Sequence, residues 1–187
     1  GTLYEGTANT AYLCRICTDS TGKKYIINQV REERLFRRIV KMFSEAEGSC
    51  AEFFTMEDTL CLVFEYNVQR AYDSFFMPDK LSCKDGERLF LKIIRECIAS
   101  SLPYPYLYMV ITQRRFNLYE NGDVSIDYAV NLERLSEEFM QLQCVEALLI
   151  ELIKFYDETG RDSISRQIVT QKYRHRSYSL LSELESD

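Results

Sequence analysis

The first thirty residues show the alternation of two strands separated by a turn. The runs AYLCRIC (11–17) and KKYIINQV (23–30) are rich in Tyr, Ile, Leu and Val, and TDSTG (18–22) between them has the composition of a turn. The pattern therefore predicts a β-hairpin at the start of the chain.

The next forty residues predict one helix followed by two strands. The run REERLFRRIVKMFSEAE (31–47) places its apolar residues on one side and its arginines on the other, which is typical of an amphipathic helix. The runs AEFFTME (51–57) and TLCLVFEY (59–66) follow as strands joined by a tight turn. The apolar side of the predicted helix consists of Leu35, Phe36, Ile39, Val40, Met42 and Phe43.

After residue 66 the pattern becomes mostly helical. Residues 70–83 predict a short helix and a loop, and residues 84–102 predict a long helix. We expect the buried side of this long helix to consist of Leu89, Phe90, Ile93, Ile94, Cys97 and Ile98.

A second, smaller hairpin is predicted within the helical part. Residues 103–111 (PYPYLYMVI) and 114–119 (RRFNLY) suggest short extended segments, and ENGD (120–123) is a tight turn into VSIDYAV (124–130). From residue 131 onward we expect helices to the end of the chain.

This order of elements predicts an α+β fold in a single domain of 187 residues. We expect two lobes, a small β-rich lobe with one helix over residues 1–68 and a mostly helical lobe over residues 69–187, with the boundary near residues 66–72. With 46% apolar and 28% charged residues, the composition is that of a globular protein with a substantial core.

Charge and cysteine content narrow the function classes. A net charge of −6 argues against nucleic-acid binding, and no run approaches the roughly 20 apolar residues of a membrane span. The seven cysteines lie mostly in apolar runs, which indicates reduced, buried thiols in a cytoplasmic protein. Cys14 and Cys17 have CxxC spacing, but there is no second such pair and the chain has one histidine, so we predict no metal site.

The opening of the chain resembles the glycine-rich loop of the eukaryotic-type protein kinases. The resemblance covers residues 3–135 in one continuous order, and the family's G-x-G-x-x-G-x-V pattern falls on Tyr4, Gly6, Asn9 and Ala11. Glycine permits the close approach of backbone to phosphate, and Tyr4 and Asn9 stand where two of these glycines would be. The resemblance therefore implies a loop that keeps its shape and has lost its phosphate contacts.

Three later segments carry the same resemblance. The strand that holds the family's lysine places Asn28 at that position, and residues 31–47 are similar to the family's C-helix. LCLVFEYN is similar to the hinge strand, with Phe64 as gatekeeper and residues 65–67 as hinge. FNLYENGDVSIDYAV (116–130) is similar to the family's N-I-L-L-D-x-N-G-x-V-K-I-x-D-F-G stretch.

Phosphoryl transfer requires charged groups that this chain lacks at the matching positions. Asn28 is neutral, and arginines stand where the C-helix glutamate would lie. No acidic residue occurs between Glu96 and Glu120, where the catalytic aspartate would be, and Arg115 aligns with a metal-binding asparagine. The aspartate of D-F-G aligns with Tyr128, or with Asp127 after a shift of one residue.

The resemblance thus implies a catalytically inactive kinase-like domain, a pseudokinase, that acts as a protein-interaction, scaffold or regulatory module with unknown protein partners. It implies no cofactor and no metal. Two alternatives stay open: a degenerate nucleotide-binding domain, and a divergent kinase-like phosphotransferase. Both would need compensating charge in the cleft, from Lys23, Lys24 or Asp127.

The helical lobe is also shorter than in the family. Minimal domains of this kind resemble the cytoplasmic parts of some bacterial membrane-anchored proteins, including proteins of secretion machinery. Residues 163–178 carry Arg166, Lys172, Arg174 and Arg176 without an acid. This basic stretch would suit an acidic partner, an anionic membrane surface or a following membrane span, and it is equally typical of a solvated helix face.

Overall fold

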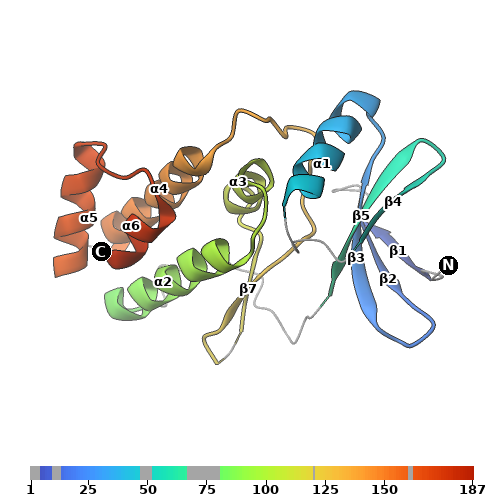
Figure 1. The fold of residues 1–187 in the computed structure, drawn as a ribbon. Coiled ribbons are helices and arrows are strands. Elements are labelled where there is room, and N and C mark those ends of the chain that lie inside the picture. The colour runs from blue at the N-terminus through green and yellow to red at the C-terminus, as the bar shows by residue number, and fades with distance from the viewer. Residues whose placement is uncertain (1–4, 10–13, 47–51, 67–80, 120, 160–161) are drawn as a thin grey trace.

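The computed structural model describes residues 5–9, 14–46, 52–66, 81–119, 121–159 and 162–187, and only the backbone of residues 5–9 (Figure 1). Within these residues the fold is α+β: an antiparallel sheet with one helix, followed by a mostly helical part.

The sheet contains β1 (Glu5–Asn9), β2 (Cys14–Thr18), β3 (Lys24–Val30), β4 (Glu52–Met56) and β5 (Thr59–Glu65) in the order β1-β2-β3-β5-β4. All neighbouring strands are antiparallel. Both tight turns have the left-handed backbone that such hairpins need: Gly22 has φ of 86°, and Glu57 and Asp58 have φ of 47° and 60°. The predicted hairpin at residues 11–30 and the strands at 51–66 are confirmed where described.

The helix α1 (Glu33–Glu45) lies against one face of the sheet, as the apolar pattern predicted. Ile39 and Phe43 are buried in the same cluster as Val30, Leu60 and Leu62. The opposite face carries a smaller cluster that consists of Cys17, Ile27, Cys61 and Val63. Because β5 is buried on both faces, its sequence is a continuous apolar run.

The helical part consists of α2 (Cys83–Ala99), α3 (Tyr104–Thr112), α4 (Gln141–Thr159), α5 (Ile164–Arg174) and α6 (Leu181–Ser186). A short hairpin of β6 (Phe116–Leu118) and β7 (Val124–Ile126) follows α3, as predicted, with Gly122 at φ of 80° in its turn. Figure 1 shows α3 between α1 and the remaining helices, so α3 links the sheet to the helical part.

Two predictions for this part are wrong. Residues 103–111 form helix α3, not an extended segment: Pro103 is its N-cap and Pro105 lies in its first turn, where proline is well accepted. Because α3 is buried on nearly all sides, its sequence shows no helical periodicity.

The second error is the helix expected from residue 131. Residues 131–140 form turns, in which the side chains of Asn131 and Ser136 accept hydrogen bonds from the amides of Glu133 and Glu138. Such local side-chain bonds compete with a helix. One helix follows at residue 141 and two shorter ones after it.

Some predictions are only partly met or lie outside the described residues. In α2, Phe90, Ile93, Ile94 and Cys97 are buried and Leu89 is half-buried, whereas Ile98 is 43% exposed, contrary to prediction. The expected lobe boundary at 66–72 and most of the segment 70–83 lie outside the described residues. Among the helices described, none combines the length and the apolar character that crossing a membrane requires.

Candidate functional site

Asn28 occupies the centre of the junction between the sheet and the helical part. It lies in β3, opposite Leu62 of β5, on the face that carries α1, and its side chain is 1% exposed. Its Nδ2 donates to the hydroxyl of Tyr106 at 2.9 Å and to the carbonyl oxygen of Tyr128 at 2.5 Å. The Tyr106 hydroxyl donates in turn to the same carbonyl at 3.2 Å. A neutral amide thus joins β3, α3 and the segment after β7.

Aromatic rings fill the space beside Asn28. The ring of Phe64, which is 2% exposed, stacks on Tyr128 with centroids 4.4 Å apart and planes 7° apart. Tyr106 lies 5.6 Å from Phe64, and Phe43 of α1 meets Tyr106 edge to face at 5.4 Å. We call Asn28, Phe43, Phe64, Tyr106 and Tyr128 the aromatic junction. It is a packed, uncharged contact between segments distant in sequence.

Arg115 and Asp127 form an ion pair next to this junction. The Arg115 Nη1 lies 3.5 Å from the Asp127 Oδ2, and the two side chains are 17% and 25% exposed. The Asp127 amide donates to the Arg115 carbonyl at 2.9 Å, which extends the β6–β7 ladder and fixes the two residues side by side. The other carboxylate oxygen, Oδ1, accepts from the Ala129 amide at 3.0 Å. Asp127 is therefore engaged on both oxygens by groups of the protein itself.

The ion pair affects the groups around it. Burial raises the pKa of the Cys14 thiol to about 11, and the Asp127 carboxylate adds to this while Arg115 opposes it. Burial also raises the pKa of Tyr66, with further contributions from Asp127 and Tyr119. Cys14 and Tyr66 are consequently neutral near pH 7, so the Asp127 side of the junction has no additional thiolate or phenolate.

The glycine-rich-loop positions are described only in part. Gly6 pairs with Cys17 and Asn9 with Cys14 in the β1–β2 ladder. The side chain of Asn9, together with Tyr4 and Ala11, lies outside what the structure describes. The structure describes the backbone of β1 alone, and it places this strand at the edge of the sheet.

Neither lysine considered as compensating charge contacts Asn28. Lys23 forms an ion pair with Glu65, and each of these side chains is about half exposed. Lys24 is exposed at the start of β3. On α1, Arg37 pairs with Glu33 at 2.6 Å on the outer surface. Of the predicted site residues, the structure brings together Asn28, Phe64 and Tyr128 in one cluster and Arg115 and Asp127 in a neighbouring pair.

Sequence reasoning missed Tyr106 and Phe43. Residues 103–111 were predicted as an extended segment, and only the helix α3 directs Tyr106 to Asn28. Phe43 was assigned to the buried side of its helix without a partner. A buried asparagine in a strand pattern was a usable signal, because such a residue needs hydrogen-bond partners.

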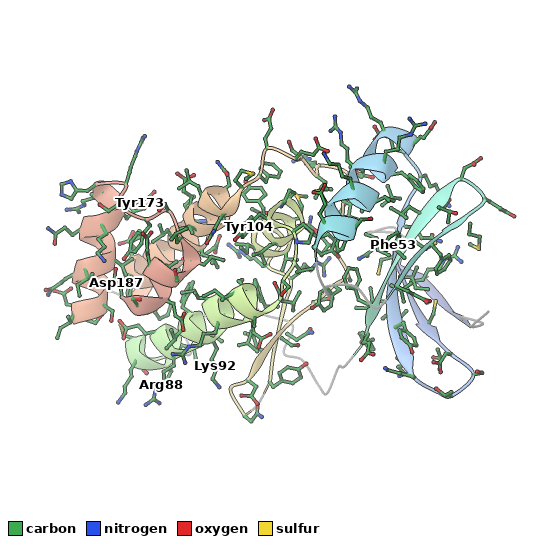
Figure 2. The ribbon with its side chains drawn as sticks, in the orientation of Figure 1. Phe53, Arg88, Lys92, Tyr104, Tyr173 and Asp187 are labelled. Atoms are coloured by element: carbon green, nitrogen blue, oxygen red, sulfur yellow. The ribbon has the colours of Figure 1, made fainter. Side chains whose placement is uncertain are left out.

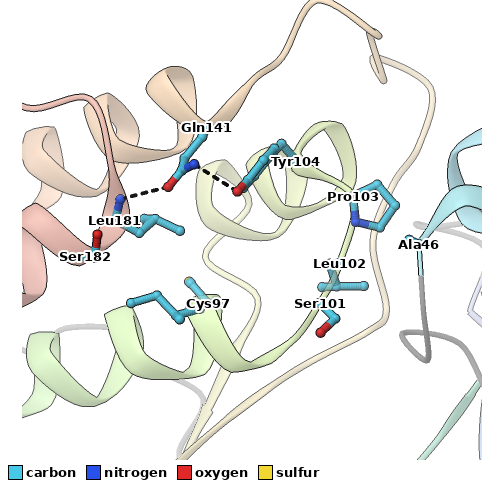
Figure 3. Close-up of a pocket in the computed structure, with 10 residues that line it drawn as sticks. Ala46, Cys97, Ser101, Leu102, Pro103, Tyr104, Gln141, Leu181 and Ser182 are labelled. Carbon is cyan, nitrogen blue, oxygen red and sulfur yellow. Dashed lines mark hydrogen bonds between the residues drawn. The ribbon is translucent and has the colours of Figure 1, made fainter.

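A separate pocket of about 400 Å³ lies where α3, α4 and α6 begin (Figure 3). Gln141 bridges it: its Nε2 donates to the Tyr104 hydroxyl at 2.9 Å, and its Oε1 accepts from the Leu181 amide at 3.0 Å. The residues that line it are uncharged, including Cys97, Ile98 and Pro103. Cys97 is buried and burial raises the pKa of its thiol, so the pocket lacks an ionised reactive group.

The described residues contain no group of three or more His, Cys, Asp or Glu side chains that could hold a metal ion. The six described cysteines are all buried, and Cys14 and Cys17 point to opposite faces of the sheet. Comparison of the chain with known protein-family models and with curated proteins gives no match.

Proposed function

We propose that the chain is a protein-kinase-like domain without phosphotransferase activity, which acts as a protein-interaction or scaffold module. The observation that carries this proposal is the aromatic junction: a neutral asparagine and stacked rings lie where the resemblance expects a lysine and a nucleotide. The proposal includes two lobes, residues 1–68 and 69–187, with the junction between them.

The arrangement of elements supports the kinase-like part of the proposal. A five-stranded antiparallel sheet carries α1 on one face, and the hairpin β6–β7 follows α3. Asn28, Phe64 and Tyr128 meet at one place although 36 and 64 residues separate them in order along the chain, and Asp127 directly precedes Tyr128. The resemblance would bring together the lysine, the gatekeeper and the D-F-G aspartate in the same way.

The chemistry of the junction supports inactivity. An adenine ring and a triphosphate need an apolar slot beside fixed cations, and here Tyr128 stacks on Phe64 while Asn28 bonds to protein groups. The Arg115 guanidinium already neutralises Asp127, so this carboxylate meets a protein cation instead of Mg²⁺. Without acidic residues from 97 to 119, no carboxylate of that segment can act on an acceptor hydroxyl.

We further propose that the domain belongs to a longer, membrane-anchored bacterial protein and lies on the cytoplasmic side. The support is the resemblance stated above together with the basic residues at the end of α5, where Arg174 and Arg176 are exposed. A hydropathy profile of the parent gene tests this part: an apolar segment of about 20 residues beyond residue 187 is expected.

The experiment for the main proposal is a thermal-shift titration with ATP, ADP and GTP, each with and without Mg²⁺ or Mn²⁺. A ligand that binds only the folded state stabilises it by about 2.7 kcal/mol at 100 times its Kd. We expect no shift at millimolar nucleotide. A metal-dependent shift would contradict the proposal and favour a nucleotide-binding or phosphotransferase domain.

A matched pair of variants sharpens the titration. Arg115→Asn removes the guanidinium from Asp127, and Arg114→Asn removes the adjacent cation, which pairs instead with Glu151 on α4 at 3.0 Å. If Arg115 occupies the place of a metal, a Mg²⁺-dependent shift can arise in the first variant and not in the second. Equal behaviour of the two variants would mean that Arg115 does not block a metal site.

A further inference from the structure

The outer side of α1 carries a row of cations that have no carboxylate partner among the residues that the structure describes. Arg34, Arg38 and Lys41 follow one another at spacings of four and three residues, so they share one helix face, and Arg31 precedes them by three residues. We call these four residues the basic stripe. Arg31, Arg34 and Lys41 are exposed and Arg38 is half-buried. In the described part of the chain, no carboxylate lies within ion-pair distance of any of them, whereas Arg37 pairs with Glu33.

This row of cations opposes the stability of α1. Like charges three or four residues apart repel each other along a helix, and Arg34, Arg37, Arg38 and Lys41 form several such neighbours. The cations also avoid the last turn, where the helix dipole would stabilise them. Local arrangements that work against folding are expected at functional or strained sites.

The stripe stands out against the charge of the whole chain. The chain has a net charge of −6, yet residues 31–45 carry five cations and three carboxylates. Figure 2 shows nitrogen-tipped side chains extending from α1 away from the sheet. Arg34, Arg38 and Lys41 cover about 10 Å of helix, which is narrow compared with a membrane or duplex surface. An extended polyanion would also meet the acidic remainder of the molecule.

An exposed apolar side chain lies on the face of the sheet that carries α1. Phe53 of the edge strand β4 pairs with Leu62, which belongs to the buried cluster beneath α1, so Phe53 is on the same face of the sheet as the helix. Phe53 is 41% exposed (Figure 2). Exposed cations on α1 and an exposed aromatic ring on the sheet face that carries α1 fit a partner with carboxylates and an apolar anchor.

We propose that the basic stripe, with Phe53, binds an acidic segment of another protein. Three of the four cations are arginines, whose planar guanidinium matches a carboxylate in two parallel hydrogen bonds. Carboxylates at helical spacing in the partner would lie opposite Arg34, Arg38 and Lys41. This inference deepens the proposed interaction function and rests on it, since it names the chemistry of the partner.

The test is a fluorescence-anisotropy titration of labelled decaglutamate, with decaglutamine as the uncharged probe. The triple variant Arg34→Glu/Arg38→Glu/Lys41→Glu should lose at least about tenfold in affinity. The matched control Lys84→Glu/Arg88→Glu reverses two exposed cations four residues apart on α2 and should bind like the unaltered protein. Affinity should fall between about 50 and 200 mM salt because the contacts are exposed charges.

Three results would overturn the proposal: no binding of decaglutamate at millimolar concentration, equal binding by the triple variant, or stripe-dependent binding of phosphatidylserine vesicles or duplex DNA that is tighter than that of decaglutamate. Stripe-dependent self-association in sedimentation velocity would overturn it as well and would make a second copy of this chain the occupant. Melting curves of each variant separate loss of binding from loss of folding. The nucleotide titration probes the aromatic junction alone, so failure of either proposal is seen independently.

Discussion

The two sides of α1 differ in burial and in charge. On the inner side, Ile39 and Phe43 are 0% and 5% exposed, and Phe43 meets the ring of Tyr106 in the aromatic junction. On the outer side, Arg34, Arg38 and Lys41 have no carboxylate partner among the described residues. The inner side is filled and neutral, and the outer side is open and cationic.

This difference indicates which part of the molecule can bind charged groups of a partner. A buried cation at Asn28 would need a carboxylate beside it, and the junction provides aromatic rings and a carbonyl oxygen instead. Water solvates the outer cations, so they remain free to exchange that hydration for a partner's carboxylates. This distribution of charge favours a domain that binds a partner at its surface over one that binds a ligand in its interior.

The largest expected effect comes from emptying the aromatic junction. Phe64→Ala should reduce the free energy of unfolding by about 3–5 kcal/mol, because it removes a buried ring and leaves a cavity. Phe53 also lies on the sheet but is 41% exposed. Phe53→Ala should therefore reduce the free energy of unfolding by well under half as much. Denaturant titration of both variants measures the difference, and equal losses would mean that the junction is loosely packed.

The hydrogen bonds of Asn28 should give the next largest effect. Asn28→Ala leaves the Tyr106 hydroxyl and the Tyr128 carbonyl without their amide partner, and we expect a loss of about 1–3 kcal/mol. A double-mutant cycle with Tyr106→Phe, read by urea unfolding, should show coupling between the two positions. Strict additivity would indicate that the two side chains do not interact in solution.

The inner and outer ion pairs should differ in strength. Arg115 and Asp127 are 17% and 25% exposed, whereas Arg37 and Glu33 are 76% and 77% exposed. The coupling energy of the inner pair should exceed the roughly 0.3–0.5 kcal/mol typical of an exposed helix pair. Cycles with Arg115→Met and Asp127→Asn, and with Arg37→Met and Glu33→Gln, measure both. If the coupling energy of the Arg115–Asp127 pair is no larger than that of the Arg37–Glu33 pair, Arg115 does not act as the cation that neutralises Asp127.

The smallest expected effect has the opposite sign. Arg34→Gln/Arg38→Gln relieves repulsion along α1 and should raise stability by a few tenths of a kcal/mol for each like-charge neighbour removed. The control Arg174→Gln/Arg176→Gln should change it less, because those residues are in or beyond the last turn of α5. Calorimetric melting at low salt checks this, and a fall in melting temperature would show that the stripe already has partners within the chain.

Strong local patterns made much of the fold predictable. The hairpins around Gly22 and Gly122 and the amphipathic α1 carry turn residues and periodicities that depend little on the rest of the chain. The helix α3 was missed because burial on nearly every side removes its period, and residues 131–140 were missed because Asn131 and Ser136 bond to local amides. Motif order named Asn28, Phe64, Arg115 and Asp127 as candidates, but the contacts of Asn28 and Phe64 include Tyr106 and Phe43, which only tertiary packing brings to them.

One measurement tests the central claim most directly: a comparison of backbone NMR shifts of the 22.0 kDa protein with MgATP and with decaglutamate. We predict that decaglutamate shifts the amides of α1 around Arg34, Arg38 and Lys41, and that MgATP leaves the amides of Asn28, Phe64 and Asp127 unchanged. Nucleotide-dependent shifts at Asn28 and Asp127, with none along α1, would contradict the account and assign the function to the interior.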